Sequence, residues 1–124
     1  MNVAIIPARG GSKRIKNKNI KLFFGKPIIT YVIKLLIKSK IFDKIIVSTD
    51  NNKIAKICAK SGAEILFKRP KFLAGDHIST SEVVRHAIKW MSKNLSKPSR
   101  VCCVYPTAVL LTLSDLKKSF IKFK

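Results

Sequence analysis

The sequence predicts an α/β protein with a doubly wound, mainly parallel sheet. Short apolar, β-branched runs alternate along the chain with longer segments in which apolar residues recur every three or four positions. Strands separated by helices imply right-handed crossovers, a parallel sheet and helices on both of its faces. Because 47% of the 124 residues are apolar, we expect one folded domain rather than a disordered basic tail.

The apolar runs place the elements in order. Each expected strand is closed by a proline or a polar residue, and the four strands lie at 3–6, 44–49, 64–67 and 101–105. Helices are expected from Pro27, over about 52–61 before Gly62, from a capping box at Ser79 and Glu82 to about 94, and from Ser114. Ligands of such sheets bind beyond the carboxyl ends of the strands. The site is therefore expected on the segments at 7–19, 50–52, 68–80 and 106–112.

The composition is strongly basic. Lys and Arg number 26 against six Asp and Glu, which gives a net charge of +20. Such a charge fits nucleic acid, an anionic membrane or a phosphorylated substrate. The cations are mostly Lys, scattered as singles and pairs, which favours solvated faces over a dedicated polyanion surface. No aromatic platform accompanies them, so we expect no specific nucleic acid and no membrane as partner, and a basic nucleic-acid-binding module stays as an alternative function.

The cysteines and the apolar runs indicate a reducing compartment. Cys58, Cys102 and Cys103 suggest no disulfide framework. They form no C-x-x-C pair and no Cys/His cluster, so no metal site is expected within this sequence. The apolar opening is too short for a signal peptide, and no run of about 18 apolar residues is present. We expect a reduced, soluble, cytoplasmic protein.

One loop has the composition of a phosphate-binding segment. Residues 9–14, Arg-Gly-Gly-Ser-Lys-Arg, follow the first strand and combine backbone N–H donors, a hydroxyl and three cations. The spacing matches neither the Walker A motif nor the dinucleotide-binding fingerprint. From the residues alone, a phosphate contact and a merely solvated basic loop both remain open.

Five further side chains fall on the expected ligand side. Lys18 and Asn19 are of interest only because of this position. Arg69 either reaches over the ligand edge or lies in water. Asp50 is a candidate cap for the helix that follows it, and Asp76 is a candidate tether of its own loop. No nucleophile is paired with a base, so covalent catalysis is not expected.

The motifs resemble a known family when they are taken together. Residues 6–14, Ile-Pro-Ala-Arg-Gly-Gly-Ser-Lys-Arg, followed by Lys-Asn-Ile at 18–20, resemble the signature opening of the acylneuraminate cytidylyltransferase family. The resemblance continues in order and spacing at 46–50, at 68–70 with Leu73, Ala74 and Asp76, and at 105–108. Cys-Cys-Val-Tyr at 102–105 is more similar to the pseudaminic acid branch.

The resemblance implies a nucleotidyltransferase of the nucleotide-diphospho-sugar transferase-like fold. In that family the anomeric hydroxyl of a sialic or pseudaminic type of nonulosonic acid attacks the α-phosphate of CTP with Mg²⁺ assistance, giving a CMP-sugar and pyrophosphate for cell-surface polysaccharides. Catalysis of this kind rests on placement and charge neutralisation.

The resemblance also implies roles for individual residues of this sequence. Arg9 and Lys18 are the implied catalytic residues, with Arg9 on the triphosphate and Lys18 near the α-phosphate. The implied substrate-binding residues are Ala8, Gly10, Gly11, Ser12 and Lys13 at the triphosphate, Asn19 at the ribose, Arg69 and the backbone near Ile78 at the cytosine, and Tyr105 and Thr107 at the sugar.

Length sets the chain apart from the family pattern. Full members are nearly twice as long, and their metal-binding acids and dimerisation segment are expected beyond Lys124. Lys16 and Val109 also stand where the family commonly has Pro. We therefore expect residues 1–124 to be the N-terminal nucleotide-binding portion of a truncated cytidylyltransferase domain with little activity alone. An inactive remnant is a further alternative, and homodimers are expected of full-length members.

Overall fold

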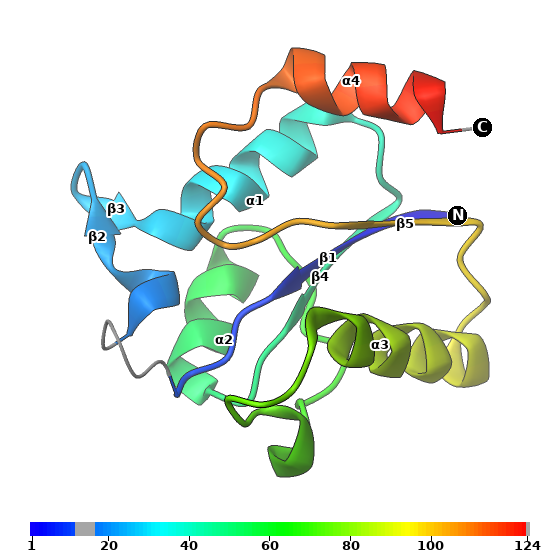
Figure 1. The fold of residues 1–124 in the computed structure, drawn as a ribbon. Coiled ribbons are helices and arrows are strands. Elements are labelled where there is room, and N and C mark those ends of the chain that lie inside the picture. Colours follow the sequence, from blue (N-terminus) through cyan, green and yellow to red (C-terminus); the bar gives the residue numbers. More distant parts are fainter. Residues whose placement is uncertain (12–16, 124) are drawn as a thin grey trace.

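The computed structural model is a three-stranded parallel sheet with helices on both faces (Figure 1). The structure describes residues 1–11 and 17–123. The central strand β1 (Asn2–Pro7) pairs in parallel with β4 (Lys44–Ser48) on one side and with β5 (Arg100–Cys103) on the other. This arrangement confirms the predicted α/β class with a mainly parallel sheet.

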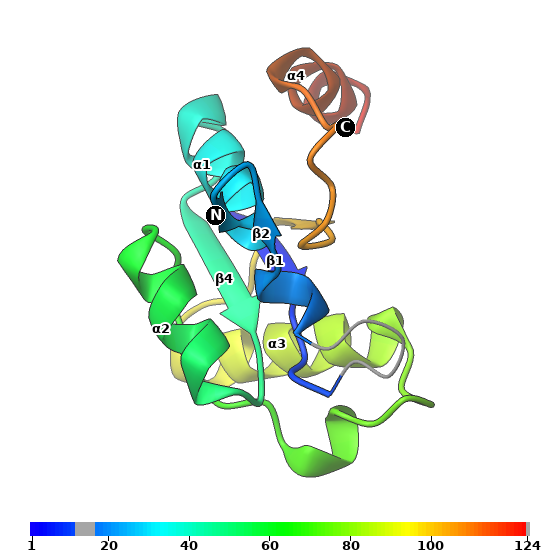
Figure 2. The same cartoon turned by 90° about the vertical axis from the view of Figure 1, so that its left-hand side faces the viewer.

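Helices cover the two faces unequally (Figure 2). Side chains of a strand alternate between faces, so Ala4 and Ile6 of β1 face one layer while Val3 and Ile5 face the other. Among the described residues, three helices pack on the first face and α3 alone on the second. Their bounds are α1 Ile28–Ser39, α2 Asn52–Lys60, α3 Thr80–Asn94 and α4 Leu113–Lys122. Within the described residues, no helix combines the length and apolarity needed to cross a membrane.

The expected strand at 64–67 is wrong, because only one bridge forms there. Glu64 pairs with Ile46 of β4, and the chain returns to the sheet only where the Arg69 N–H donates to the Thr49 carbonyl over 2.9 Å. Between these points, Leu66 and Phe67 both pack against the α3 face. Two consecutive side chains on one face break the alternation that a strand requires.

Two short elements that the sequence did not indicate lie between β1 and α1. A 3-10 turn covers Lys18–Ile20, and a small antiparallel hairpin joins β2 (Leu22–Phe23) to β3 (Lys26–Pro27). The two turn residues between the strands have positive φ, 49° and 80°, as two-residue hairpin turns require. A further 3-10 turn, Lys71–Leu73, follows Pro70 within the segment expected as a polar loop.

The end of α2 matches the expected glycine signal. The helix ends in a Schellman motif, in which the Gly62 N–H donates to Ala59 and the Ala63 N–H donates to Cys58, each over 3.1 Å. Gly62 has φ 104°, and a Cβ there would lie 2.8 Å from Cδ1 of Ile37 on α1. A side chain at this position therefore meets both a backbone and a packing cost.

We predict that Gly62→Ala lowers the free energy of unfolding by about 1 to 2 kcal/mol. The cost comes mainly from the left-handed backbone, because the Ile37 methyl is the far end of a flexible side chain. Gly75→Ala is the matched control, since a Cβ at Gly75 meets nothing within 4 Å, and its effect should stay within about 0.5 kcal/mol. Urea denaturation measures both variants, and equal effects would contradict this account of the helix end.

Candidate active site

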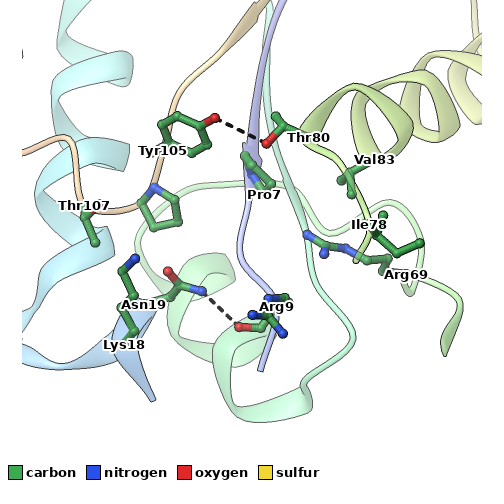
Figure 3. A pocket seen from close by; sticks show the side chains of 11 residues that line it. Pro7, Arg9, Lys18, Asn19, Arg69, Ile78, Thr80, Val83, Tyr105 and Thr107 are labelled. Atoms are coloured by element: carbon green, nitrogen blue, oxygen red, sulfur yellow. Dashed lines mark hydrogen bonds between the residues drawn. The ribbon is translucent and has the colours of Figure 1, made fainter. Parts of the chain in front are cut away.

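A cavity of about 360 Å³ opens at the carboxyl ends of β1 and β5 (Figure 3). This is the edge at which parallel α/β sheets bind ligands. Segments far apart in the sequence supply its walls, and the lining residues are Pro7, Arg9, Lys18, Asn19, Arg69, Ile78, Thr80, Val83, Tyr105, Pro106 and Thr107.

The cavity gathers most of the residues that the sequence singled out. Those that line it are Arg9, Lys18, Asn19, Arg69, Ile78, Tyr105 and Thr107. Ala8 is fully buried beneath the strand end, and Gly10 and Gly11 continue the same loop without lining the cavity. Ser12 and Lys13 lie outside the described residues.

A hydrogen-bonded carboxylate shapes the start of the glycine loop. The Gly10 N–H donates to Oδ1 of Asp50 over 2.8 Å. A Cβ on Gly10 would lie only 2.8 Å from Nδ2 and 2.9 Å from Cβ of Asn51, so the loop approaches α2 as closely as only glycine allows. Asp50 was a candidate cap of α2, and the structure contradicts this role. The Asn51 side chain caps the helix instead, because it accepts a hydrogen bond from the Ile54 N–H.

Arg9 is fixed between two loops. Its guanidinium pairs with the Asp76 carboxylate over 2.7 Å and donates to the Gly11 carbonyl. The Asn19 amide donates to the Arg9 carbonyl over 2.9 Å. Asp76 thus ties its own loop to the strand end, as the sequence suggested, although a partly exposed ion pair adds little stability by itself.

Arg69 is buried, with 3% of its surface exposed. Of the two alternatives that the sequence left open, burial excludes the one in which this side chain lies in water. Its guanidinium donates to the Ser48 carbonyl over 2.7 Å, to the Ser48 hydroxyl over 3.1 Å and to the Leu73 carbonyl over 3.4 Å. Burial lowers the pKa of Arg69, while the charge of Asp50 raises it and that of Arg9 lowers it further. A guanidinium carries five N–H donors, so within the described part of the chain two remain for a ligand.

The helix start of α3 forms another wall. Ser79 and Glu82 form the expected capping box, with bonds of 3.2 Å and 2.9 Å. Thr80 follows directly, and its hydroxyl lies 3.3 Å from that of Tyr105, beyond the end of β5 (Figure 3). Sequence reasoning missed Thr80 and Val83 as lining residues, although the capping box was the signal that fixed where this helix begins.

The electrostatics of the cavity favour an anionic ligand. Arg9, Lys18 and Arg69 bring three cations to its walls. The carboxylates of Asp50 and Asp76 already hold a backbone N–H and a guanidinium. Fixed cations and backbone donors in a concave site attract polyphosphate groups. In the described chain, no three His, Cys, Asp or Glu side chains come close enough together to hold a metal ion.

We predict that Arg69→Ala lowers the free energy of unfolding by about 2 to 3 kcal/mol, because the carbonyl groups that accept from this buried guanidinium are left without a hydrogen-bond donor. The exposed Arg85 of α3 offers the control, and Arg85→Ala should change stability by less than about 0.5 kcal/mol. Denaturant titration of the two variants makes the comparison. If Arg69→Ala leaves the free energy of unfolding unchanged, this side chain does not anchor the site.

The comparisons with known proteins identify one family. The family model described as cytidylyltransferase matches residues 3–124. A pseudaminic acid cytidylyltransferase of Campylobacter jejuni is 44% identical over 122 residues, which cover 98% of this chain and 53% of that protein. An N-acylneuraminate cytidylyltransferase of Escherichia coli is 42% identical over 86 residues, covering 69% of this chain and 20% of that protein.

A comparison with solved structures shows which fold the chain shares. A solved structure of CMP:2-keto-3-deoxy-manno-octonic acid synthetase, complexed with CTP, superposes with a TM-score of 0.78 at 21% identity, covering 98% of this chain and 46% of that one. The chain thus spans about half the length of the Campylobacter jejuni relative and of this structure. From the match along residues 3–124, the chain belongs to the cytidylyltransferase family, as its motifs indicated.

Proposed function

We propose that the cavity binds CTP and that this chain is the nucleotide-binding portion of an enzyme that transfers CMP from CTP to a sialic or pseudaminic type of nonulosonic acid. The observation that carries the proposal is the convergence of Arg9, Lys18 and Arg69 on one cavity at the carboxyl edge of the sheet. A volume of about 360 Å³ suits a small-molecule site.

In this proposal each wall of the cavity contacts a different part of the nucleotide. Arg9, Lys18 and the glycine loop meet the triphosphate, where cations and backbone N–H groups bind phosphate oxygens. The two N–H groups of Arg69 that remain available, with the backbone near Ile78, meet the cytosine, and Asn19 meets the ribose. Tyr105 and Thr107 lie across the cavity on the side assigned to the sugar acid.

The proposed reaction is a single displacement at phosphorus. The anomeric hydroxyl oxygen of the sugar acid bonds to the α-phosphorus, and the bond from that phosphorus to the oxygen bridging the β-phosphate breaks. Pyrophosphate leaves with that electron pair, and the hydroxyl proton passes to solvent. Lys18 and Arg9 stabilise the negative charge that develops on the phosphate oxygens. The remaining rate enhancement comes from holding the two substrates in the correct relative position.

The carboxylates described here do not fit a Mg²⁺ site by themselves. Mg²⁺ is usually held by one or two carboxylates together with substrate phosphates. At this cavity Asp50 accepts the Gly10 N–H and Asp76 pairs with Arg9, so each already has a structural partner. We propose that Mg²⁺ ligands and the surface of a homodimer come from the part of full-length family members that this chain does not span.

The experiment that tests the proposal is calorimetry with CTP, ATP and GTP. We predict that CTP binds more tightly than either purine nucleotide by about 1 to 3 kcal/mol, because a purine leaves buried donors of Arg69 without a matching acceptor. Repeating the titrations at raised salt separates base recognition from charge attraction, which salt screens. Equal affinity for the three nucleotides would leave charge attraction alone and contradict the proposed base contact.

We predict that Lys18→Ala weakens CTP binding about tenfold, as expected when one charged contact to phosphate is lost. Lys21→Ala is the matched control, because Lys21 is an exposed cation of the same segment that does not line the cavity. Losing it removes the same charge from the neighbourhood and should change the affinity less than about threefold. An equal loss of CTP affinity in both variants would show that Lys18 acts only through the overall positive charge of the chain and not through a direct contact with phosphate.

A further inference from the structure

The guanidinium of Arg9 is held by the protein through one of its three nitrogens. Nη1 makes both of the bonds, one to the Asp76 carboxylate over 2.7 Å and one to the Gly11 carbonyl. A guanidinium has five N–H groups, and Nη1 carries two of them. Within the described part of the chain, the N–H groups of Nε and Nη2 therefore remain for a ligand.

Asp76 contacts Arg9 without entering the cavity wall. Arg9 lines the cavity (Figure 3), whereas Asp76 is not among the lining residues. Both side chains are about one third exposed, at 31% and 29%, so the ion pair contributes little to stability. A carboxylate close to a site for polyphosphate also repels that ligand. The position of Asp76 is therefore better explained by what it does to Arg9 than by stability or by the charge of the site.

The ion pair fixes the one part of Arg9 that the backbone leaves free. The Asn19 amide donates to the Arg9 carbonyl over 2.9 Å and so holds the main chain after β1. Asp76 holds the side chain, and it comes from the segment before α3 that also supplies Ile78 to the cavity. A free arginine side chain loses rotamer entropy when it binds a ligand. Holding it beforehand lowers that cost.

We propose that Asp76 is a positioning residue, which holds Nη1 of Arg9 so that the remaining guanidinium N–H groups meet the β- and γ-phosphates of CTP. The inference rests on the proposed function, in which Arg9 contacts the triphosphate. Two effects of Asp76 on CTP affinity have opposite signs. As a negative charge it repels the triphosphate, so its removal alone tightens binding. As the partner that holds Arg9 it favours binding, so its removal weakens binding.

The test is calorimetry of Asp76→Ala with CTP and with CMP, which lacks the β- and γ-phosphates. We expect CTP to bind about fivefold to tenfold more weakly than to the native chain, and CMP to change less than about twofold. The retained CMP affinity also shows that the variant is folded with its cavity intact. Asp76→Glu keeps a carboxylate that can reach Arg9, and it should recover most of the CTP affinity.

A double variant and a matched ion pair separate positioning from charge. If Asp76 acts through Arg9, adding Asp76→Ala to Arg9→Ala should weaken CTP binding by less than about twofold further. Glu64→Gln is the control, because Glu64 pairs with Lys44 over 3.2 Å and neither residue lines the cavity. It removes one negative charge and leaves Arg9 held, so CTP affinity should stay within about twofold of native.

Tighter or unchanged CTP binding by Asp76→Ala overturns the inference, because charge removal alone then explains the variant. An equal loss for CTP and CMP overturns it too, as does a loss that adds in full to that of Arg9→Ala. The proposed function fails in a different way. A native chain that binds no CTP contradicts both, whereas normal CTP binding by the native chain and by Asp76→Ala contradicts the positioning role alone.

Discussion

The parallel register of β1 between its two neighbours is the constraint on which the site depends. Pro7 lies opposite Ser48 of β4, and Ile5 lies opposite Cys103 of β5, so three chain segments leave the sheet at the same edge. Backbone bonds continue past the strands, since the Ala8 N–H donates to the Ser48 carbonyl over 2.9 Å. Residues about a hundred positions apart in the chain, such as Pro7 and Thr107, thereby share one cavity.

Polar groups then hold the loops in place at that edge. The Ser48 carbonyl accepts a hydrogen bond from the buried Arg69 guanidinium, and the Asp50 carboxylate accepts one from the Gly10 N–H. The end of β4 therefore anchors both the glycine loop and the cavity wall that contains Arg69. The carboxylates at the site are engaged with protein donors, while Lys18 is exposed at the cavity wall. The guanidinium groups of Arg9 and Arg69 are held by protein partners before any ligand arrives, so they lose little entropy when an anion binds.

The sequence predicted the features that local chemistry decides. The capping box at Ser79 predicted the start of α3, and the glycine loop after β1 lies at the edge of the sheet where the cavity opens. It failed where tertiary packing decides. Burial of Arg69 depends on a Ser48 carbonyl distant in sequence, and the strand expected at 64–67 was lost because Leu66 and Phe67 share a face. The β2–β3 hairpin was missed because its turn places Phe24, a residue that seldom has positive φ, at φ 49°.

The measurement that tests the central claim most directly is residue-resolved hydrogen exchange of the native chain with and without saturating CTP. If the carboxyl edge is the nucleotide site, protection should appear at the amides of Asn19, Ile78 and Thr107, which line the cavity from three separate segments. Exchange at the amide of Phe120 in α4, which does not line this cavity, should stay unchanged. Protection confined to residues outside the cavity, or none under conditions where CTP is bound, would contradict the assignment of this edge.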